Sequence, residues 1–326
     1  MSSDLTFITN EPGKELRDRF GVLLGDDTRF PTCLSFITRS LPSDAYQFAD
    51  LSKESKFAGD LRAITFRQIP LQRVKSSKDL SLYFGKELRA GQVQFVNALE
   101  IKDAGIQYHR SGIGLKNKGG NDLYERLFNS DRRTFKSSQP VWYGRLMDKW
   151  TITPQTDEFF NLDYDRVLKF NETASFSQTT FNVSPKILWR QTASCLRATI
   201  DTDRRWFRNT IQCAYIKGAY QEKLDVHYVL GVINSRFITH AYNSLVKEAG
   251  RVFPQVKLTH VKKLPLAIAD KADQKEIADL VKKILAAKQR DAEADTSALE
   301  REIDELVYAL YGLTPEEKAL VQAAAK

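Results

Sequence analysis

The amino-acid sequence predicts an α+β fold, in which an irregular β-rich region with packed helices is followed by a C-terminal helical hairpin. Short apolar runs such as Ile187-Leu188-Trp189 are typical of buried strands. Residues 270–326 instead carry apolar side chains at helical spacing and contain a single glycine. The hydrophobic content of 42% and the aromatic content of 11% can fill a core. We therefore expect a folded chain rather than a disordered one.

The N-terminal region divides into an opening segment, 1–30, and an α/β part, 31–94. The turn Glu11-Pro12-Gly13 precedes the amphipathic stretch 14–24, which predicts a helix. In the α/β part, the residue pattern predicts strands over 34–38 and 62–69 and a helix that begins at 46–51.

The middle of the chain mixes glycine-rich turns with short strands. We expect the run 105–120 to be a flexible hairpin, because Asn117 stands where a dinucleotide loop needs its third glycine. A short helix is expected over 122–128. The pattern then predicts strands over 150–153, 167–170, 186–191, 198–200 and 210–215, and one amphipathic helix over 225–245.

The C-terminal region, 269–326, differs in charge and periodicity from the rest. Residues 270–326 hold 9 Lys/Arg against 13 Asp/Glu. Helix starts of the capping-box type are expected at Ser297-x-x-Glu300 and at Thr314-Pro315-x-Glu317. The apolar stripes can pack on the chain's own domain, or they can serve as a spacer, docking or dimerisation arm.

Positive charge is concentrated in residues 183–263. This segment holds 14 Lys/Arg against 5 Asp/Glu, a net charge of +9 in a chain whose total is +8. The remainder of the chain therefore nets −1. A local basic patch is the usual footprint of a protein that binds a phosphate backbone.

Cations alternate with aromatic residues across this patch and in the segments before it. Guanidinium groups bind phosphates and guanine edges, and planar rings add rigid contact area. The run 204–208 is expected to be its exposed part. The candidate DNA-binding residues are Arg110, Lys116, Lys118, Arg145, Lys186, Arg190, Gln191, Arg204, Arg205, Trp206, Arg208, Lys257, Lys262 and Lys263.

Motifs for catalysis, cofactors and metals are missing from the sequence. It contains no phosphate-binding P-loop, no Pro-Pro pair of the kind that amino-methyltransferases use, and no nuclease carboxylate spacing. Its three cysteines and four histidines are scattered. We therefore predict no catalytic, cofactor-binding or metal-binding residue, and whether the chain is part of an enzyme stays open. No apolar run is long enough to span a membrane and no signal peptide is visible, so we expect a cytoplasmic protein.

A family resemblance covers 95–312. It is carried by pieces in a fixed order: Ala104 to Tyr108, Val141-Trp142-Tyr143-Gly144-Arg145, Pro185 to Thr192, Tyr228 to Phe237, Phe253 to Pro265, and Leu299 to Thr314. Together they resemble the target-recognition portion of TaqI-like adenine-specific DNA methyltransferases and fused restriction–modification enzymes. The resemblance implies DNA reading by a domain over 95–268, with the strand 186–192 and the region 144–145 near the DNA. It does not carry over methyl transfer, so S-adenosylmethionine is expected only on a partner methyltransferase.

A second resemblance is confined to residues 1–30, which are similar to the opening of bacterial helicases with a phospholipase-D-like nuclease module. The His-x-Lys-x4-Asp pattern of such a nuclease is absent, because Ala267 stands where the Asp after His260-Val261-Lys262 is needed. We expect this leader to carry no activity.

Three functions remain open at this point. The first is a stand-alone specificity module of a restriction–modification or phage-defence system, which binds double-stranded DNA and works with a separate methyltransferase or restriction subunit. The second is a C-terminal fragment of a split or truncated adenine-N6 DNA methyltransferase. The third is a decoy whose basic face binds an acidic protein.

Overall fold

The structure is a computed structural model that describes residues 6–8, 35–37, 45–48, 67–70, 88, 91–111, 121–246 and 255–323. The chain forms two compact units, Met1–Tyr83 and Phe84–Lys326. Helices and antiparallel sheets are both present, which confirms the predicted α+β class.

The first unit contributes two antiparallel strand pairs. Strand β1 (Thr6–Ile8) pairs with β2 (Ser35–Ile37), and β3 (Ala45–Phe48) pairs with β4 (Arg67–Pro70). The strands predicted over 34–38 and 62–69 are thus present in part. The helix expected from 46 is wrong at its start, because Tyr46 and Phe48 alternate with Gln47 as a strand requires. The helix predicted over 14–24 lies outside the described residues.

A four-stranded antiparallel sheet forms the centre of the second unit. Its order is β15 (Ala198–Asp201), β14 (Lys186–Arg190), β17 (Ile211–Ile216) and β6 (Leu99–Lys102), which confirms the three strands predicted from this part of the sequence. Side chains of β14 alternate between two hydrophobic cores. Ile187 and Trp189 belong to one core and Leu188 to the other. Burial on both faces explains why this strand is continuously apolar.

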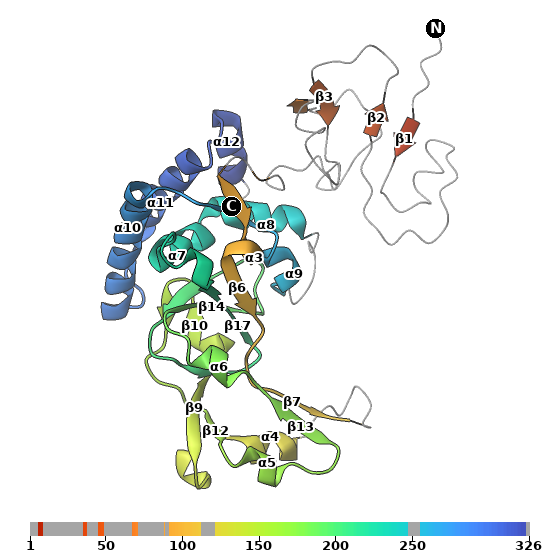
Figure 1. The fold of residues 1–326 in the computed structure, drawn as a ribbon, viewed down its shortest axis with the longest axis vertical. Helices are drawn as coiled ribbons and strands as arrows, with labels where there is room; N and C mark the ends of the chain where they lie inside the picture. Colours follow the sequence, from red (N-terminus) through yellow and green to blue (C-terminus); the bar gives the residue numbers. More distant parts are fainter. Residues whose placement is uncertain are drawn as a thin grey trace. The chain divides into compact units, whose positions relative to one another are not determined.

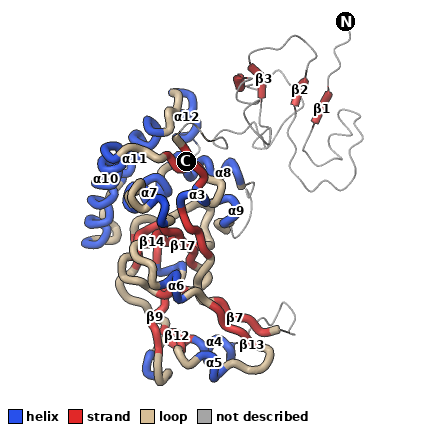
Figure 2. Tube along the Cα trace, viewed as in Figure 1, coloured by secondary structure: helices blue, strands red, loops and turns tan. Residues whose placement is uncertain are grey.

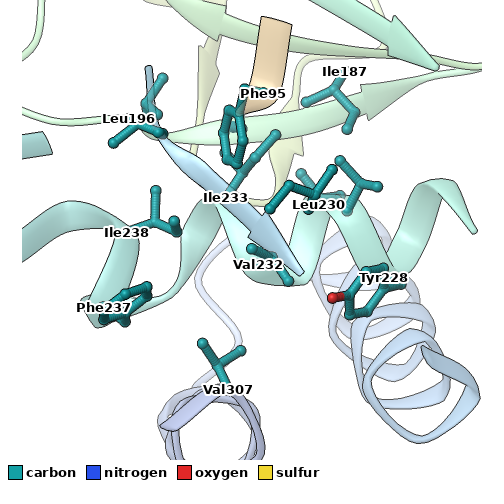
Figure 3. Close-up of a cluster of buried hydrophobic side chains, with 14 of the residues drawn as sticks. Phe95, Ile187, Leu196, Tyr228, Leu230, Val232, Ile233, Phe237, Ile238 and Val307 are labelled. Carbon is teal, nitrogen blue, oxygen red and sulfur yellow. The ribbon is translucent and has the colours of Figure 1, made fainter. Parts of the chain in front are cut away.

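Helices cover one face of this sheet, as Figure 2 shows. Helix α7 (Val226–Asn234) is followed at once by α8 (Arg236–Leu245), with Ser235 between them. The single helix predicted over 225–245 is therefore two helices. Ser235 has an extended backbone, and its hydroxyl accepts a hydrogen bond from the backbone N–H of Ile238 at 3.2 Å, which caps α8. Figure 3 shows the first core, where Leu230 and Ile233 meet Phe95 and Ile187.

The C-terminal helices pack on α7 and α8. They are α10 (Lys271–Arg290), α11 (Ser297–Leu310) and α12 (Pro315–Ala323), and they contribute Ile277, Val281 and Val307 to the first core. The predicted helical hairpin is confirmed, and its apolar stripe is used within the chain's own fold.

The capping box predicted at the start of α12 is confirmed, whereas the one predicted at the start of α11 is wrong, because the residue before that helix makes no side-chain capping hydrogen bond. At α12, the Thr314 N–H donates to Glu317 Oε2 at 2.9 Å, and the Glu317 N–H donates to Thr314 Oγ1 at 3.2 Å. At α11, the residue before the helix is Thr296 rather than Ser297, and its hydroxyl donates to Glu300 Oε1 at 2.8 Å.

The elements around the second core lie on the other side of the central sheet from α7 and α8 (Figure 1). This core contains several aromatic side chains, such as Phe128, Phe160 and Phe181. Two small sheets surround it, in the orders β16-β9-β12-β8 and β13-β7. Their strands are β7 (Gln107–Arg110), β8 (Phe128–Asn129), β9 (Ser138–Trp142), β12 (Phe159–Asn161), β13 (Glu172–Ser175) and β16 (Trp206–Phe207). The accompanying helices are α4 (Asn121–Leu127), which confirms the helix predicted over 122–128, α5 (Tyr164–Val167) and α6 (Gln178–Phe181).

The remaining described elements of the second unit are short. They are β5 (Gln92–Gln94), α3 (Phe95–Ala98), η4 (Arg132–Thr134), η5 (Gly144–Leu146), β10 (Met147–Asp148), β11 (Thr151–Ile152), η6 (Gly218–Tyr220), α9 (Leu258–Val261) and β18 (Pro265–Ala267). The strand predicted over 150–153 is the second half of a tight β10–β11 pair. The strand predicted over 167–170 is wrong, because these residues end α5 and form the turn into β13. None of the helices within the described ranges is long and apolar enough to cross a bilayer.

Gly231 marks the closest approach between α7 and the C-terminal helices. A Cβ added there would lie 2.6 Å from Ile277 Cγ2 and 3.0 Å from Val281 Cγ2. We predict that Gly231→Ala lowers the free energy of unfolding by about 1–3 kcal/mol, because overpacking outweighs the helix-propensity gain of alanine. Urea denaturation measures this. Gly218→Ala is the control, since nothing lies within 4 Å of its added Cβ. Equal stability of the two variants would contradict the packing argument.

Candidate nucleic-acid interface

The turn between β15 and β16 is built around a buried carboxylate. Asp201 is fully buried and accepts hydrogen bonds from the backbone N–H groups of Asp203 at 3.1 Å and Arg205 at 3.0 Å. Between them, Arg204 adopts a left-handed backbone with φ of 56°, which is uncommon for a residue other than glycine. The Arg204 side chain is exposed, and the described residues give it no ion pair. The turn therefore fixes one cation in an outward position.

Lys186 was expected to contact DNA, and the structure corrects this. Its side chain is fully buried, and its Nζ lies 2.7 Å from Asp201 Oδ2. The same Nζ donates to the carbonyl oxygens of Phe181 at 3.0 Å and Val183 at 3.1 Å. All three hydrogens of the ammonium group thus have partners inside the fold, as a buried lysine requires. Lys186 supports the turn that carries Arg204 and does not face a ligand.

Arg205 and Arg208 are also held inside the fold, so the expectation that the whole run 204–208 is exposed is wrong. The Arg205 side chain is 12% exposed, binds Asp201 at 2.9 Å, and lies over the Trp142 ring at 5.2 Å. The Arg208 side chain is 20% exposed and binds Glu158 at 2.9 Å. Ring stacking and a nearby carboxylate make both guanidinium groups part of the packing.

Trp206 belongs to the second core rather than to an open surface. Its ring lies 4.9 Å from that of Phe181 and 5.1 Å from that of Phe176, measured between centroids, and the residue is partly buried. Arg204 is therefore the member of the run that the structure leaves outward and unpaired among the described residues.

Besides Arg204, a second exposed cation is Arg145, which lies in η5 near the C-terminal end of β14. The preceding Gly144 donates its N–H to Thr210 Oγ1 at 3.0 Å, and a Cβ at this position would lie 3.3 Å from Arg190 Cβ. The added Cβ would also lie 3.1 Å from the Thr210 carbonyl oxygen, so a larger residue at Gly144 would require its neighbours to shift by a few tenths of an ångström. The Arg145 guanidinium lies 5.9 Å from the centre of the Tyr143 ring, and no carboxylate among the described residues pairs with it.

Arg190 and Arg197 share the carboxylate of Asp148. Arg190 Nη2 lies 3.8 Å from Asp148 Oδ2, and the Arg197 guanidinium binds Asp148 Oδ1. Burial raises the pKa of Asp148, but the hydrogen bonds from Arg197 and from the backbone of Lys149 outweigh it, so the net shift is downward. Sequence reasoning missed Arg197 because it has no aromatic neighbour in the chain, although it lies within the basic segment.

Gln191 is placed by backbone pairing at the end of β14. Its N–H donates to the Thr210 carbonyl at 2.8 Å, and its own carbonyl accepts from Val256 at 2.7 Å. The side chain is half-buried. Gln191 thus lies beside the η5 segment that presents Arg145, as the geometry of Gly144 and Thr210 requires.

Arg110 is anchored in an ion-pair network that ties β7 and β13 to α4. Its Nε donates to Glu172 Oε1 at 2.9 Å, and its Nη2 lies 2.8 Å from Asp122 Oδ2. Arg126 binds the same Glu172 carboxylate at 2.7 Å. The hydrogen bond from Arg126 is the largest influence that lowers the pKa of Glu172 to about 2. Arg110 is 13% exposed and is committed to this network.

The remaining candidates lie in two places. Lys116 and Lys118 are outside the described residues. Lys263 is exposed, whereas Lys257 and Lys262 are half-buried. Sequence reasoning missed two further cations, Lys102 and Lys217, which lie near Glu100 together with Lys262. All three lower the pKa of Glu100, and the hydrogen bond from Lys102 is the main cause.

The described ranges contain no group of three His, Cys, Asp or Glu side chains arranged to hold a metal ion. What the site offers is a set of guanidinium and ammonium groups, of which Lys186 and Arg205 are held by the buried Asp201 while Arg145 and Arg204 are exposed. Such an arrangement suits a ligand that carries many negative charges.

Comparison with known proteins gives one family match. Residues 140–266 match the family model described as the TaqI-like C-terminal specificity domain. This confirms the predicted resemblance for that segment, which includes β14 and the Asp201 turn. Among curated proteins, nothing matches.

A similarity among solved structures is to the type IIG restriction endonuclease BpuSI, with 11% sequence identity and a TM-score of 0.36. The alignment covers 76% of this chain and 36% of that protein, so the chain spans little more than a third of its length.

Removing the Lys186 ammonium group tests the role of the buried pair. We predict that Lys186→Met lowers the free energy of unfolding by about 3 kcal/mol, because the Asp201 carboxylate stays buried without one of its partners. Urea denaturation is the measurement. Lys263→Met, at an exposed position, should leave stability within about 0.5 kcal/mol. A Lys186→Met variant as stable as the Lys263→Met variant would show that the pair does not support the fold.

The Glu172 network predicts a pH dependence. Since folding lowers the pKa of Glu172 from 4.5 to about 2, its stabilisation is complete above pH 4.5 and is lost as the pH falls toward 2. Glu172→Gln should therefore reduce stability at pH 7, and the difference from the wild type should shrink between pH 4.5 and pH 2. Urea denaturation across this range, with the exposed Glu302→Gln as control, measures the effect. A difference that stays constant with pH would contradict it.

Proposed function

We propose that this chain binds double-stranded DNA sequence-specifically, as a stand-alone target-recognition module of a restriction–modification or phage-defence system. The match of residues 140–266 to a specificity-domain family supports this proposal. The net charge of +9 in residues 183–263 supports it as well, because the phosphate backbone supplies much of the affinity of DNA-binding proteins.

The observation that carries the proposal is the Asp201 turn. It holds Arg204 in a left-handed conformation with the side chain exposed. Unusual backbone geometry persists where the surrounding structure enforces it, and it clusters at functional sites. The turn thus sets the point from which the backbone presents the Arg204 side chain, and its exposed guanidinium group can bind a phosphate or a guanine edge.

A second group of side chains can complete the interface at the end of β14. Arg145 lies exposed beside Arg190 and the amide of Gln191, and Gly144 allows the two segments to approach. Arginine reads guanine and glutamine reads adenine in the major groove. We assign base reading to this end of the sheet and phosphate binding to Arg204.

Catalysis would belong to a partner. Because the sequence carries neither a methyltransferase nor a nuclease motif, the proposal places S-adenosylmethionine on a separate methyltransferase subunit in the same cytoplasmic compartment. Selection of bound duplexes from a random library, with and without candidate methyltransferase or restriction subunits, tests both parts of the proposal. Recovery of a common sequence by the chain alone would support independent target reading, and recovery of unrelated duplexes alone and with each subunit would oppose it.

Arg204 provides the sharpest single-residue test. We predict that Arg204→Ala weakens duplex binding at low salt. The negative slope of log K against log[salt] should become less steep by about 0.9, the value for one phosphate contact. Its stability should not change, since the side chain is exposed and has no ion pair among the described residues. Fluorescence anisotropy across a salt series measures the affinity.

Two variants serve as controls for that experiment. Lys283→Ala removes an exposed cation on α10 and should leave the slope unchanged. Arg205→Ala should lower stability, because this guanidinium is paired with Asp201 and stacked on Trp142. If Arg204→Ala binds DNA with the wild-type affinity and slope, the interface has been placed wrongly.

A further inference from the structure

Phe170 is the most exposed large apolar side chain in the described part of the chain, with a relative exposure of 108%. It lies in the turn between α5 and β13. The neighbouring rings behave differently: Phe160, Tyr164 and Phe176 contact one another with centroids 5.3–5.6 Å apart in the second core. A single exposed apolar residue is ordinary by itself, so its setting must decide whether it has a role.

The turn that carries Phe170 is braced at both ends. The Glu172 N–H donates to the Lys169 carbonyl at 3.0 Å, and the Lys169 N–H donates to Glu172 Oε2 at 2.8 Å. Asn171 is joined to Ser111 by three hydrogen bonds. The Ser111 N–H and hydroxyl donate to the Asn171 carbonyl at 2.8 and 3.2 Å, and Asn171 Nδ2 donates to the Ser111 carbonyl at 3.0 Å. The residues on each side of Phe170 are therefore fixed.

The bracing reaches deep into the second core. The Glu172 side chain is fully buried and binds Arg110 and Arg126, and Arg126 also donates to the Val167 carbonyl at the end of α5. In Figure 1, β7 and β13 run side by side, with α4 and α5 nearby. A buried network thus holds a turn whose tip is an aromatic ring in full contact with solvent. Such rigidity is what a contact residue needs to bind without loss of conformational entropy.

The charge around Phe170 identifies the kind of ligand. Lys169 is 65% exposed at its side chain, and Arg166 is exposed. The Lys169 Nζ lies 3.4 Å from Asp122 Oδ2, and the exposed Asp165 precedes Arg166; exposed ion pairs of this kind are weak, so both cations can still contact a phosphate. An apolar ring flanked by cations matches a base step flanked by phosphates.

We propose that Phe170 is a wedge that inserts between adjacent base pairs of the duplex bound by this chain. The inference deepens the proposed function and rests on it. Lys169 and Arg166 bind the phosphates on either side, while the ring stacks on a partly opened step. Apolar side chains that enter a base step unstack it and bend the duplex, and the deformation favours sequences with flexible steps. Phe170 would then add specificity without a hydrogen bond to a base.

The test uses the full chain and a duplex recovered from the random-library selection, synthesised with 2-aminopurine at successive adenine positions. Wild-type protein should raise 2-aminopurine fluorescence at one step, and Phe170→Ala should not. Phe170→Ala should also weaken binding about tenfold. On a duplex with a mismatch at the same step, the wild-type protein should bind more tightly, because unstacking that step costs less, and the Phe170→Ala variant should gain less affinity from the mismatch. Phe170→Leu should restore part of the signal, since leucine is also used as a wedge.

Leu162→Ala is the matched control, because Leu162 is an exposed apolar side chain, 37% exposed, in the same part of the unit. Equal losses for the Leu162→Ala and Phe170→Ala variants, or unchanged 2-aminopurine fluorescence with Phe170→Ala, would overturn the wedge. Failure of the wild-type chain to bind any duplex in a salt-dependent way would instead overturn the proposed function. Thermal melting of the Phe170→Ala variant should match the wild type, since the ring packs on nothing.

Discussion

The ion pair between Lys186 and Asp201 is the interaction on which the candidate interface depends. It joins the first residue of β14 to the last residue of β15 at 2.7 Å, with both side chains fully buried. The Asp201 carboxylate needs several donors to stay charged inside the protein, and it obtains two of them from the backbone of the following turn. The requirement to satisfy a buried charge therefore sets the path of the chain at Arg204.

The same sheet connects this turn to the helical part of the unit. Asn234, at the end of α7, binds both the N–H and the carbonyl of Ala198 at 2.9 Å, and Ala198 begins β15. Trp189 is fixed in β14 by a buried hydrogen bond to Gln212 at 2.9 Å. Since β14 buries side chains in both cores, neither core can shift without moving the strand between them. The C-terminal helices thus stabilise the position of the turn although they lie on the opposite face of the sheet.

Sequence patterns predict the parts of this fold that depend on nearby residues. The apolar run of β14, the stripes of α10 and α11, and the Thr314–Glu317 capping box all follow from local spacing. The partners of the cations could not be predicted in this way. Lys186 and Asp201 are 15 positions apart, and Arg110 and Glu172 are 62 apart. Because these partners are distant in the sequence, Lys186 and Arg110 look like exposed cations when only their neighbours in the chain are considered.

Local patterns also failed where a side chain changed its role through tertiary contacts. The alternation in 167–170 is typical of a strand, but Glu172 needs the Lys169 N–H as a donor, and this closes a turn that leaves Phe170 outside. Arg205 and Arg208 follow the pattern of an exposed basic run, yet Trp142 and Glu158 draw them inward.

The formal net charge of the basic segment consequently exceeds the charge that its exposed, unpaired side chains present to a ligand. The basic segment has a formal excess of +9, but Lys186 and Arg205 neutralise Asp201 inside the fold, and Arg190 and Arg197 share Asp148. A ligand meets the excess charge through the cations that remain outward, on backbone segments whose path the buried network sets. The buried acids therefore do more than offset charge: by holding some arginines inward, they restrict the contact surface to a few groups. A surface of that kind discriminates between ligands by geometry as well as by charge.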